Sequence, residues 1–240
     1  MRLITQDRLH EISMMQNIAP MTRNLLILNL LMFIAQSLSP ELNFWVGLRF
    51  FTSELFQPYQ LLTHMFAHGG LGHIFGNMLA LFVFGSTLEH SFGSKRFLAF
   101  YLICGLGASL LFNAADGFML YQEFGTIFPN ELSGSAQTAL ERQLSGTRTS
   151  PYYGLVGASG AVFGILMAFA MLYPNVKLML LFPPIPIKAK YFVALYGAYE
   201  LYATIQANPG DNVAHLAHLG GMLFAFILVK LWRNDIRSMY

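Results

Sequence analysis

The chain contains six largely uncharged apolar runs, each close to the length that crosses a lipid bilayer. They lie at roughly residues 20–38, 72–89, 97–115, 154–173, 191–207 and 213–232. A helix needs about 20 apolar residues to cross the hydrocarbon core. Hydrocarbon offers the backbone no hydrogen-bond partner, so runs of this kind fold as helices. We therefore expect an all-α polytopic membrane protein with six transmembrane helices.

Composition and charge agree with a membrane protein. Of the 240 residues, 55% are hydrophobic and only 11% are charged, whereas soluble domains carry about 25% charged residues. The net charge of +2 is too small to indicate a nucleic-acid partner. Cys104 is the single cysteine, which excludes an internal disulfide. Membrane lipid is the partner that the composition predicts.

The ends of the chain and two long loops complete the expected organisation. Residues 1–23 carry charges and lack the apolar core of a cleavable signal peptide, so the first span is expected to stay in the mature protein. Residues 1–19 are expected to form a cytoplasmic N-terminal segment. The membrane domain then covers 20–232, and 233–240 form a cytoplasmic tail. Two outer loops are expected at 39–71 and 116–153.

The distribution of basic residues predicts which side each loop faces. With both termini in the cytoplasm, 11 of the 14 basic residues fall in inner segments, as the positive-inside rule requires. These are Arg2, Arg8, Arg23, Lys95, Arg96, Lys177, Lys188, Lys190, Lys230, Arg233 and Arg237. Only Arg49, Arg142 and Arg148 lie outside. The expected orientation is therefore N-in, C-in.

Polar residues inside the spans converge at one depth in this topology. His73 and Asn77 are four residues apart, so they share one face of the second helix near its outer end. Ser159 lies near the outer end of the fourth helix, and His215 and His218 lie at the outer end of the sixth. Polar groups within a span are costly and by default indicate function.

Each of these groups also has a structural interpretation. Gly157 and Gly160 belong to a small-residue face, and such faces more often allow close helix packing than chemistry. Gly221 has the same interpretation. His73 and Asn77 can form an interhelical hydrogen-bonding pair.

A metal site is another interpretation of the histidines. His64 and His68 have the i, i+4 spacing of zinc ligands, but the metalloprotease pattern needs a glutamate where this chain has Met65. No cysteine or carboxylate completes the ligand set, so we expect no metal and no other cofactor. Glu89 and Glu200 are interpreted as structural hydrogen-bonding partners.

The combination of groups favours acyl transfer. A serine becomes a nucleophile beside a base, and histidine is the usual base. Asn and His side chains can donate to a developing oxyanion. A serine at a helix N-terminus adds unpaired backbone N–H groups and the positive end of the helix dipole.

Three motifs resemble the rhomboid intramembrane serine proteases. They are the stretch from His64 to Asn77, the sequence Gly157-Ala-Ser159-Gly and the sequence Ala-His218-Leu-Gly-Gly221. The resemblance implies a Ser159–His218 dyad and an oxyanion hole that contains His73, Asn77, the Ser159 backbone N–H and Gly157. It also implies that Phe163 places a ring against His218 and that Gly221 allows two helices to approach. One departure is Tyr59-Gln60, where many members have Trp-Arg.

The expected function is therefore that of a serine endopeptidase that cleaves single-span membrane proteins near the outer membrane face, in a bacterial plasma membrane. The fifth helix and the loop 208–212 are expected to form a movable gate. A catalytically inactive rhomboid-like scaffold and a polytopic transporter are the alternatives.

The charge distribution generates a topology test. In a Cys104→Ala background, cysteines at Arg142 and Arg148 should react with an impermeant maleimide in intact cells, whereas cysteines at Lys95 and Lys188 should not. Labelling at Lys95 without membrane disruption would contradict the N-in, C-in orientation.

Overall fold

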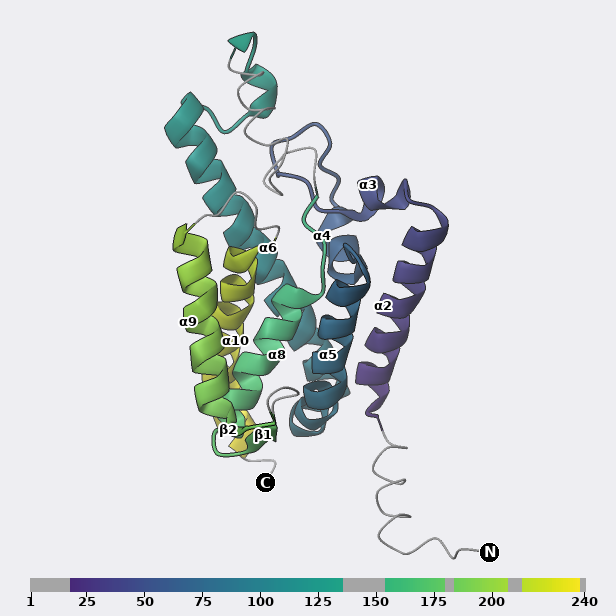
Figure 1. The fold of residues 1–240 in the computed structure, drawn as a ribbon, viewed down its shortest axis with the longest axis vertical. Helices are drawn as coiled ribbons and strands as arrows, with labels where there is room; N and C mark the ends of the chain where they lie inside the picture. The colour runs from purple at the N-terminus through teal and green to yellow at the C-terminus, as the bar shows by residue number, and fades with distance from the viewer. Residues whose placement is uncertain (1–17, 136–153, 180–183, 207–212, 238–240) are drawn as a thin grey trace, which may run out of the picture.

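A helix forms at each of the six apolar runs. The computed structural model describes residues 18–135, 154–179, 184–206 and 213–237. The main helices are α2 (Pro20–Leu38), α5 (Leu71–Phe92), α6 (Ser94–Phe124), α8 (Ser159–Leu172), α9 (Ala189–Gln206) and α10 (His215–Arg237). Figure 1 shows that α2 begins and α10 ends at the same end of the bundle, which also carries β1 and β2. These strands, Lys177–Met179 and Pro186–Lys188, pair antiparallel.

Several helices qualify as membrane spans. Among the described residues, four helices are long and apolar enough to cross a bilayer: α2, α5, α6 and α10. Helix α8 is apolar but has only 14 residues. The chain is thus a polytopic membrane protein with its short central helix packed among longer ones.

Helix α8 begins later than predicted. A helix was expected from residue 154, but the helix starts only at Ser159. Leu155 and Leu48 exchange backbone hydrogen bonds of 2.8 and 2.9 Å. Gly157 then adopts φ +137°, a conformation that glycine tolerates and other residues avoid. A backbone bridge to Leu48 and a turn at Gly157 therefore prevent a helix in residues 154–158, despite their apolar pattern.

The two loops that were expected on the outer side also differ from their expected bounds. Helix α6 continues to Phe124 and ends at Gly125, whose φ of +73° is a left-handed cap. The second loop therefore begins beyond residue 116. Its short helix η2 (Pro129–Glu131) is described, whereas residues 136–153 and 1–17 lie outside the described part of the chain. The first loop contains α3 (Leu42–Val46), α4 (Gln60–Thr63) and η1 (His64–Phe66).

The carboxylate of Glu89 links three helices through hydrogen bonds. It accepts hydrogen bonds from the backbone N–H groups of Met21 and Thr22 at 2.9 and 2.7 Å. It also accepts from the hydroxyls of Thr22 and Ser94. Glu89, near the end of α5, therefore caps the start of α2 and holds the start of α6. This agrees with its interpretation as a structural hydrogen-bonding partner.

Helix α8 lies at the centre of the bundle, against α5, α6, α9 and α10 (Figure 1). Glycines bring its backbone close to its neighbours. A Cβ atom added to Gly221 of α10 would lie 1.8 Å from the carbonyl oxygen of Gly160. A Cβ added to Gly164 would lie 2.7 Å from the Cβ of Cys104 on α6. The backbones of α8 and α10 are therefore in direct contact.

This contact predicts that Gly221→Ala is destabilising. The added methyl group meets a backbone atom that cannot rotate away, and overpacking of this kind costs about 1–3 kcal/mol. For a chain of this size, roughly 2 kcal/mol lowers the Tm by about 4–8 °C. Thermal unfolding in detergent measures the change. Gly76→Ala on α5, where an added Cβ meets nothing within 4 Å, is the matched control and should keep the wild-type Tm or raise it.

Candidate active site

Ser159 is the first residue of α8 and is half-buried. The first helical backbone bond at this end runs from the Val162 N–H to the Ala158 carbonyl. The N–H groups before Val162 therefore have no partner within the helix. Gly157 anchors the approach to the helix, because its N–H donates to the His64 carbonyl at 2.9 Å. Ser159 is thus held on a fixed turn at the positive end of a helix dipole.

Gly157 lies between a histidine and the serine. A Cβ atom at this position would lie 2.9 Å from Nε2 of His73 and 3.3 Å from Oγ of Ser159. The His73 ring and the Ser159 hydroxyl therefore face the same small space. Any side chain at Gly157 would fill that space and would also strain the backbone at φ +137°.

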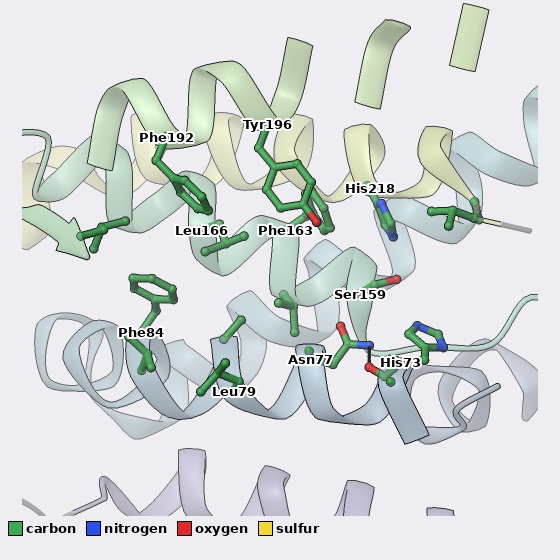
Figure 2. Close-up of a pocket in the computed structure, with 18 of the residues that line it drawn as sticks. His73, Asn77, Leu79, Phe84, Ser159, Phe163, Leu166, Phe192, Tyr196 and His218 are labelled. Atoms are coloured by element: carbon green, nitrogen blue, oxygen red, sulfur yellow. Dashed lines mark hydrogen bonds between the residues drawn. The ribbon is translucent and has the colours of Figure 1, made fainter. Parts of the chain in front are cut away.

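His73 presents its Nε2 as a hydrogen-bond donor. The Gly69 N–H donates to Nδ1 of His73 at 3.3 Å, which assigns the neutral ring its proton on Nε2. One turn along α5, the buried Asn77 donates an amide hydrogen to the His73 carbonyl at 3.0 Å. The amide has a second hydrogen to offer. His73 and Asn77 therefore line the same cavity as Ser159, and each has a hydrogen-bond donor at this end of it (Figure 2).

His218 is held on two sides. Its ring stacks on Phe163 with a centroid distance of 4.0 Å and an interplanar angle of 8°. Its Nδ1 lies 2.9 Å from Oε2 of Glu200 on α9. Nδ1 of His215 lies 2.6 Å from the same oxygen. The ring of His218 is therefore fixed in plane and in tautomer, with its Nε2 left for the cavity.

One cavity joins these groups. It has a volume of about 730 Å³ and is lined from α5, α8, α9 and α10. Figure 2 shows the Ser159 hydroxyl between the rings of His218 and His73. Phe84, Leu166 and Phe192 line the rest of the cavity and make it apolar. The cavity therefore combines a polar end, where chemistry is possible, with an apolar channel between α5 and α9.

His64 and His68 have structural roles. Nδ1 of His64 donates to the Gln60 carbonyl at 2.7 Å, and Nδ1 of His68 lies 3.2 Å from the Phe66 carbonyl. Burial lowers the pKa of His64 to about 4. Burial, with a smaller contribution from His73, lowers the pKa of His68 to about 4 as well. Both rings are therefore neutral at physiological pH.

The expectation that no carboxylate joins the histidines was wrong. Among the described residues, one group has the composition and spacing of a metal site, and it consists of Glu200, His215 and His218. The acid is 15 residues from one histidine and 18 from the other in sequence. Antiparallel packing of α9 on α10 brings it to them, and no local spacing reveals this contact.

Comparison with known proteins decides the family. The Rhomboid domain family model matches residues 55–234. The chain belongs to the rhomboid family. RHOMBOID-like protein 12, mitochondrial, from Arabidopsis thaliana is 31% identical over 77% of this chain and 49% of its own length. Rhomboid protease AarA from Providencia stuartii is 28% identical over 68% of this chain and 52% of its own length.

A rhomboid protein from yeast is also similar to this chain. Rhomboid protein 1, mitochondrial, from Saccharomyces cerevisiae is 28% identical over 68% of this chain and 38% of its own length. This rhomboid therefore spans about half the length, or less, of these three relatives. The region that the family model matches, residues 55–234, contains the helices that line the cavity.

In this rhomboid, Gln60 stabilises the long loop between α2 and α5. Its side-chain oxygen accepts from the N–H groups of Arg49 and Gln57 at 3.2 and 3.1 Å. Its side-chain nitrogen donates to the carbonyls of Trp45 and Leu55 at 3.4 and 3.2 Å. A neutral amide thus binds four backbone groups of the loop at the position where the resemblance implied an arginine.

Proposed function

We propose that this rhomboid is a serine endopeptidase that cleaves single-span membrane proteins. One observation carries the proposal: Ser159, at the start of α8, shares a cavity with an oriented histidine base and two side-chain donors. A nucleophile, a base and an oxyanion site are the three parts that acyl transfer requires.

The proposed reaction has two halves. Ser159 Oγ attacks the carbonyl carbon of the scissile peptide bond while Nε2 of His218 takes the hydroxyl proton. His218 then gives this proton to the leaving nitrogen as the peptide bond breaks, which leaves an acyl-enzyme ester. Water attacks the ester carbonyl while Nε2 of His218 takes a proton from it. His218 then returns this proton to Ser159 Oγ as the acyl–Oγ bond breaks, which releases the carboxylic acid product and restores the serine.

The oxyanion would be stabilised by Nε2–H of His73, the amide of Asn77 and the backbone N–H of Ser159. The Gly157 N–H already donates to the His64 carbonyl, so Gly157 would contribute the open space rather than a donor. Donors fixed before the reaction need little reorganisation when charge develops.

The apolar part of the cavity favours a membrane-embedded substrate. It lies between α5 and α9, and α9 exposes large apolar side chains such as Leu195, Leu201 and Ile205 along its outer surface. We propose that a substrate segment enters between these two helices and that α9 moves as the gate. The loop 208–212, expected to form part of this gate, lies outside the described residues.

We propose six spans with both termini in the cytoplasm, which places Ser159 near the outer face. α8 and α9 would then cross with the four longer helices, and the membrane domain would cover 20–232. The family includes relatives named mitochondrial; the bacterial plasma membrane is our proposed location for this chain.

The proposed dyad predicts that two substitutions abolish activity and a third does not. Ser159→Ala removes the nucleophile and His218→Ala removes the base, so both should end cleavage of a panel of single-span substrates in detergent. Ser159→Ala should also end reaction with a fluorophosphonate probe.

His215→Ala is the matched control, because it removes a second histidine one turn away on the same helix. It should retain measurable turnover. A purified His218→Ala protein that cleaves, beside an inactive His215→Ala protein, would overturn the dyad. An inactive scaffold or a transporter would show no Ser159-dependent labelling.

The proposed oxyanion hole predicts a graded loss. Removal of one preorganised donor costs about 10²–10³-fold in rate, so Asn77→Ala and His73→Ala should each slow cleavage while Ser159 still reacts with the probe. Full activity in the double substitution would show that the oxyanion is stabilised elsewhere.

A further inference from the structure

Glu200 is an unusual residue for the surface helix that carries it. Helix α9 buries only three of its residues: Ala189, Val193 and Glu200. Glu200 is 1% exposed, and a buried carboxylate is costly unless it is bonded to suitable partners. The buried carboxylate of Glu200 must therefore form hydrogen bonds that offset the cost of its burial.

Those contacts are the two histidines of α10. Oε2 of Glu200 lies 2.9 Å from Nδ1 of His218 and 2.6 Å from Nδ1 of His215. An ionised carboxylate only accepts hydrogen bonds, so both Nδ1 atoms carry protons. A neutral His218 that is protonated on Nδ1 has its lone pair on Nε2, the atom that must receive the Ser159 proton.

We propose that Glu200 is a positioning residue that holds His218 in its reactive tautomer and stabilises the imidazolium that forms during the reaction. The inference rests on the proposed function, and it adds an acid to the Ser–His dyad that the family resemblance implies. Glu200 does not itself line the cavity, whereas its partner His218 does, so Glu200 acts through His218.

Phe163 and Glu200 have separate tasks in this arrangement. Stacking on Phe163 fixes the plane of the His218 ring but is indifferent to which nitrogen carries the proton. The carboxylate decides the tautomer. Val193, Gly197 and Glu200 are spaced along the side of α9 that packs toward Met222 and α10, so helix packing brings the acid to the histidine.

The distances favour direct hydrogen bonds over a bridging metal. Two donor atoms on one tetrahedral zinc lie roughly 3.3 Å apart, given zinc–ligand bonds of about 2.0–2.1 Å. Here the carboxylate oxygen is 2.6 and 2.9 Å from the two nitrogens, which are hydrogen-bond lengths. Zinc and chelator treatments are therefore included in the test.

The test is Glu200→Gln in the full chain, with steady-state cleavage of a substrate that wild-type protein cuts in a Ser159-dependent way. Glutamine keeps the shape of the Glu200 side chain, but its NH₂ group can donate to Nδ1 of His218 and so favour the tautomer protonated on Nε2. It also has no negative charge to stabilise the imidazolium. We expect kcat to fall by about 10²- to 10⁴-fold, the range for a misplaced or mis-tautomerised catalytic group, with KM nearly unchanged.

His215→Phe is the matched control. It removes one hydrogen bond to Glu200 and keeps a ring beside Tyr199. The ring centroids of Tyr199 and His215 lie 5.9 Å apart. We expect it to lower the Tm about as much as Glu200→Gln does, but to keep kcat within about tenfold of wild type. This comparison shows whether Glu200 positions His218 for catalysis or only stabilises the packing of α9 on α10.

Two results would overturn the inference. One is a Glu200→Gln protein with kcat within a few-fold of wild type, or with a loss of kcat no larger than that of His215→Phe. The other is loss of wild-type activity in a strong chelator with recovery on adding zinc, which would assign the three residues to a metal. Cleavage that persists in Ser159→Ala would instead contradict the proposed function itself.

Discussion

The close approach of α8 and α10 is the contact on which the rest of the structure depends. Gly221 lies against the backbone of Gly160, with no room for a side chain between them. Because the contact is made one residue after Ser159 and three residues after His218, it fixes where both side chains can meet. A larger separation of the two helices would leave the serine and the histidine apart whatever their rotamers.

Polar groups in this bundle are bound by several partners at once. Glu89 joins the ends of three helices, Gln60 binds four backbone groups of the loop between α2 and α5, and Glu200 binds two histidines. In an apolar environment an unpaired polar group is expensive, so each of these side chains stabilises one arrangement of the elements around it. Glu200 differs from the others because its partner His218 also lines the cavity. Any movement of α9 away from α10 must therefore break this bond or carry the histidine with it.

Much of the helical framework could be predicted from hydropathy, since all six runs form helices. The errors are local and have clear causes. The start of α8 was placed too early because apolar residues 154–158 look helical, whereas Leu155 pairs with Leu48 and Gly157 turns the chain. The end of α6 was placed too early because polar residues after 115 resemble a loop, whereas the helix continues to Phe124.

By itself the sequence determined the identity of the polar residues in the spans and the order of the helices, because hydropathy and i, i+4 spacing are local properties that a chain carries before it folds. Tertiary structure alone decided the contact between Glu200 and the two histidines, the space between His73 and Ser159 at Gly157, and the loop contacts of Gln60. Each of these joins segments that are distant along the chain. Their distances follow from how whole helices pack, and packing depends on glycines and side-chain volumes throughout the bundle.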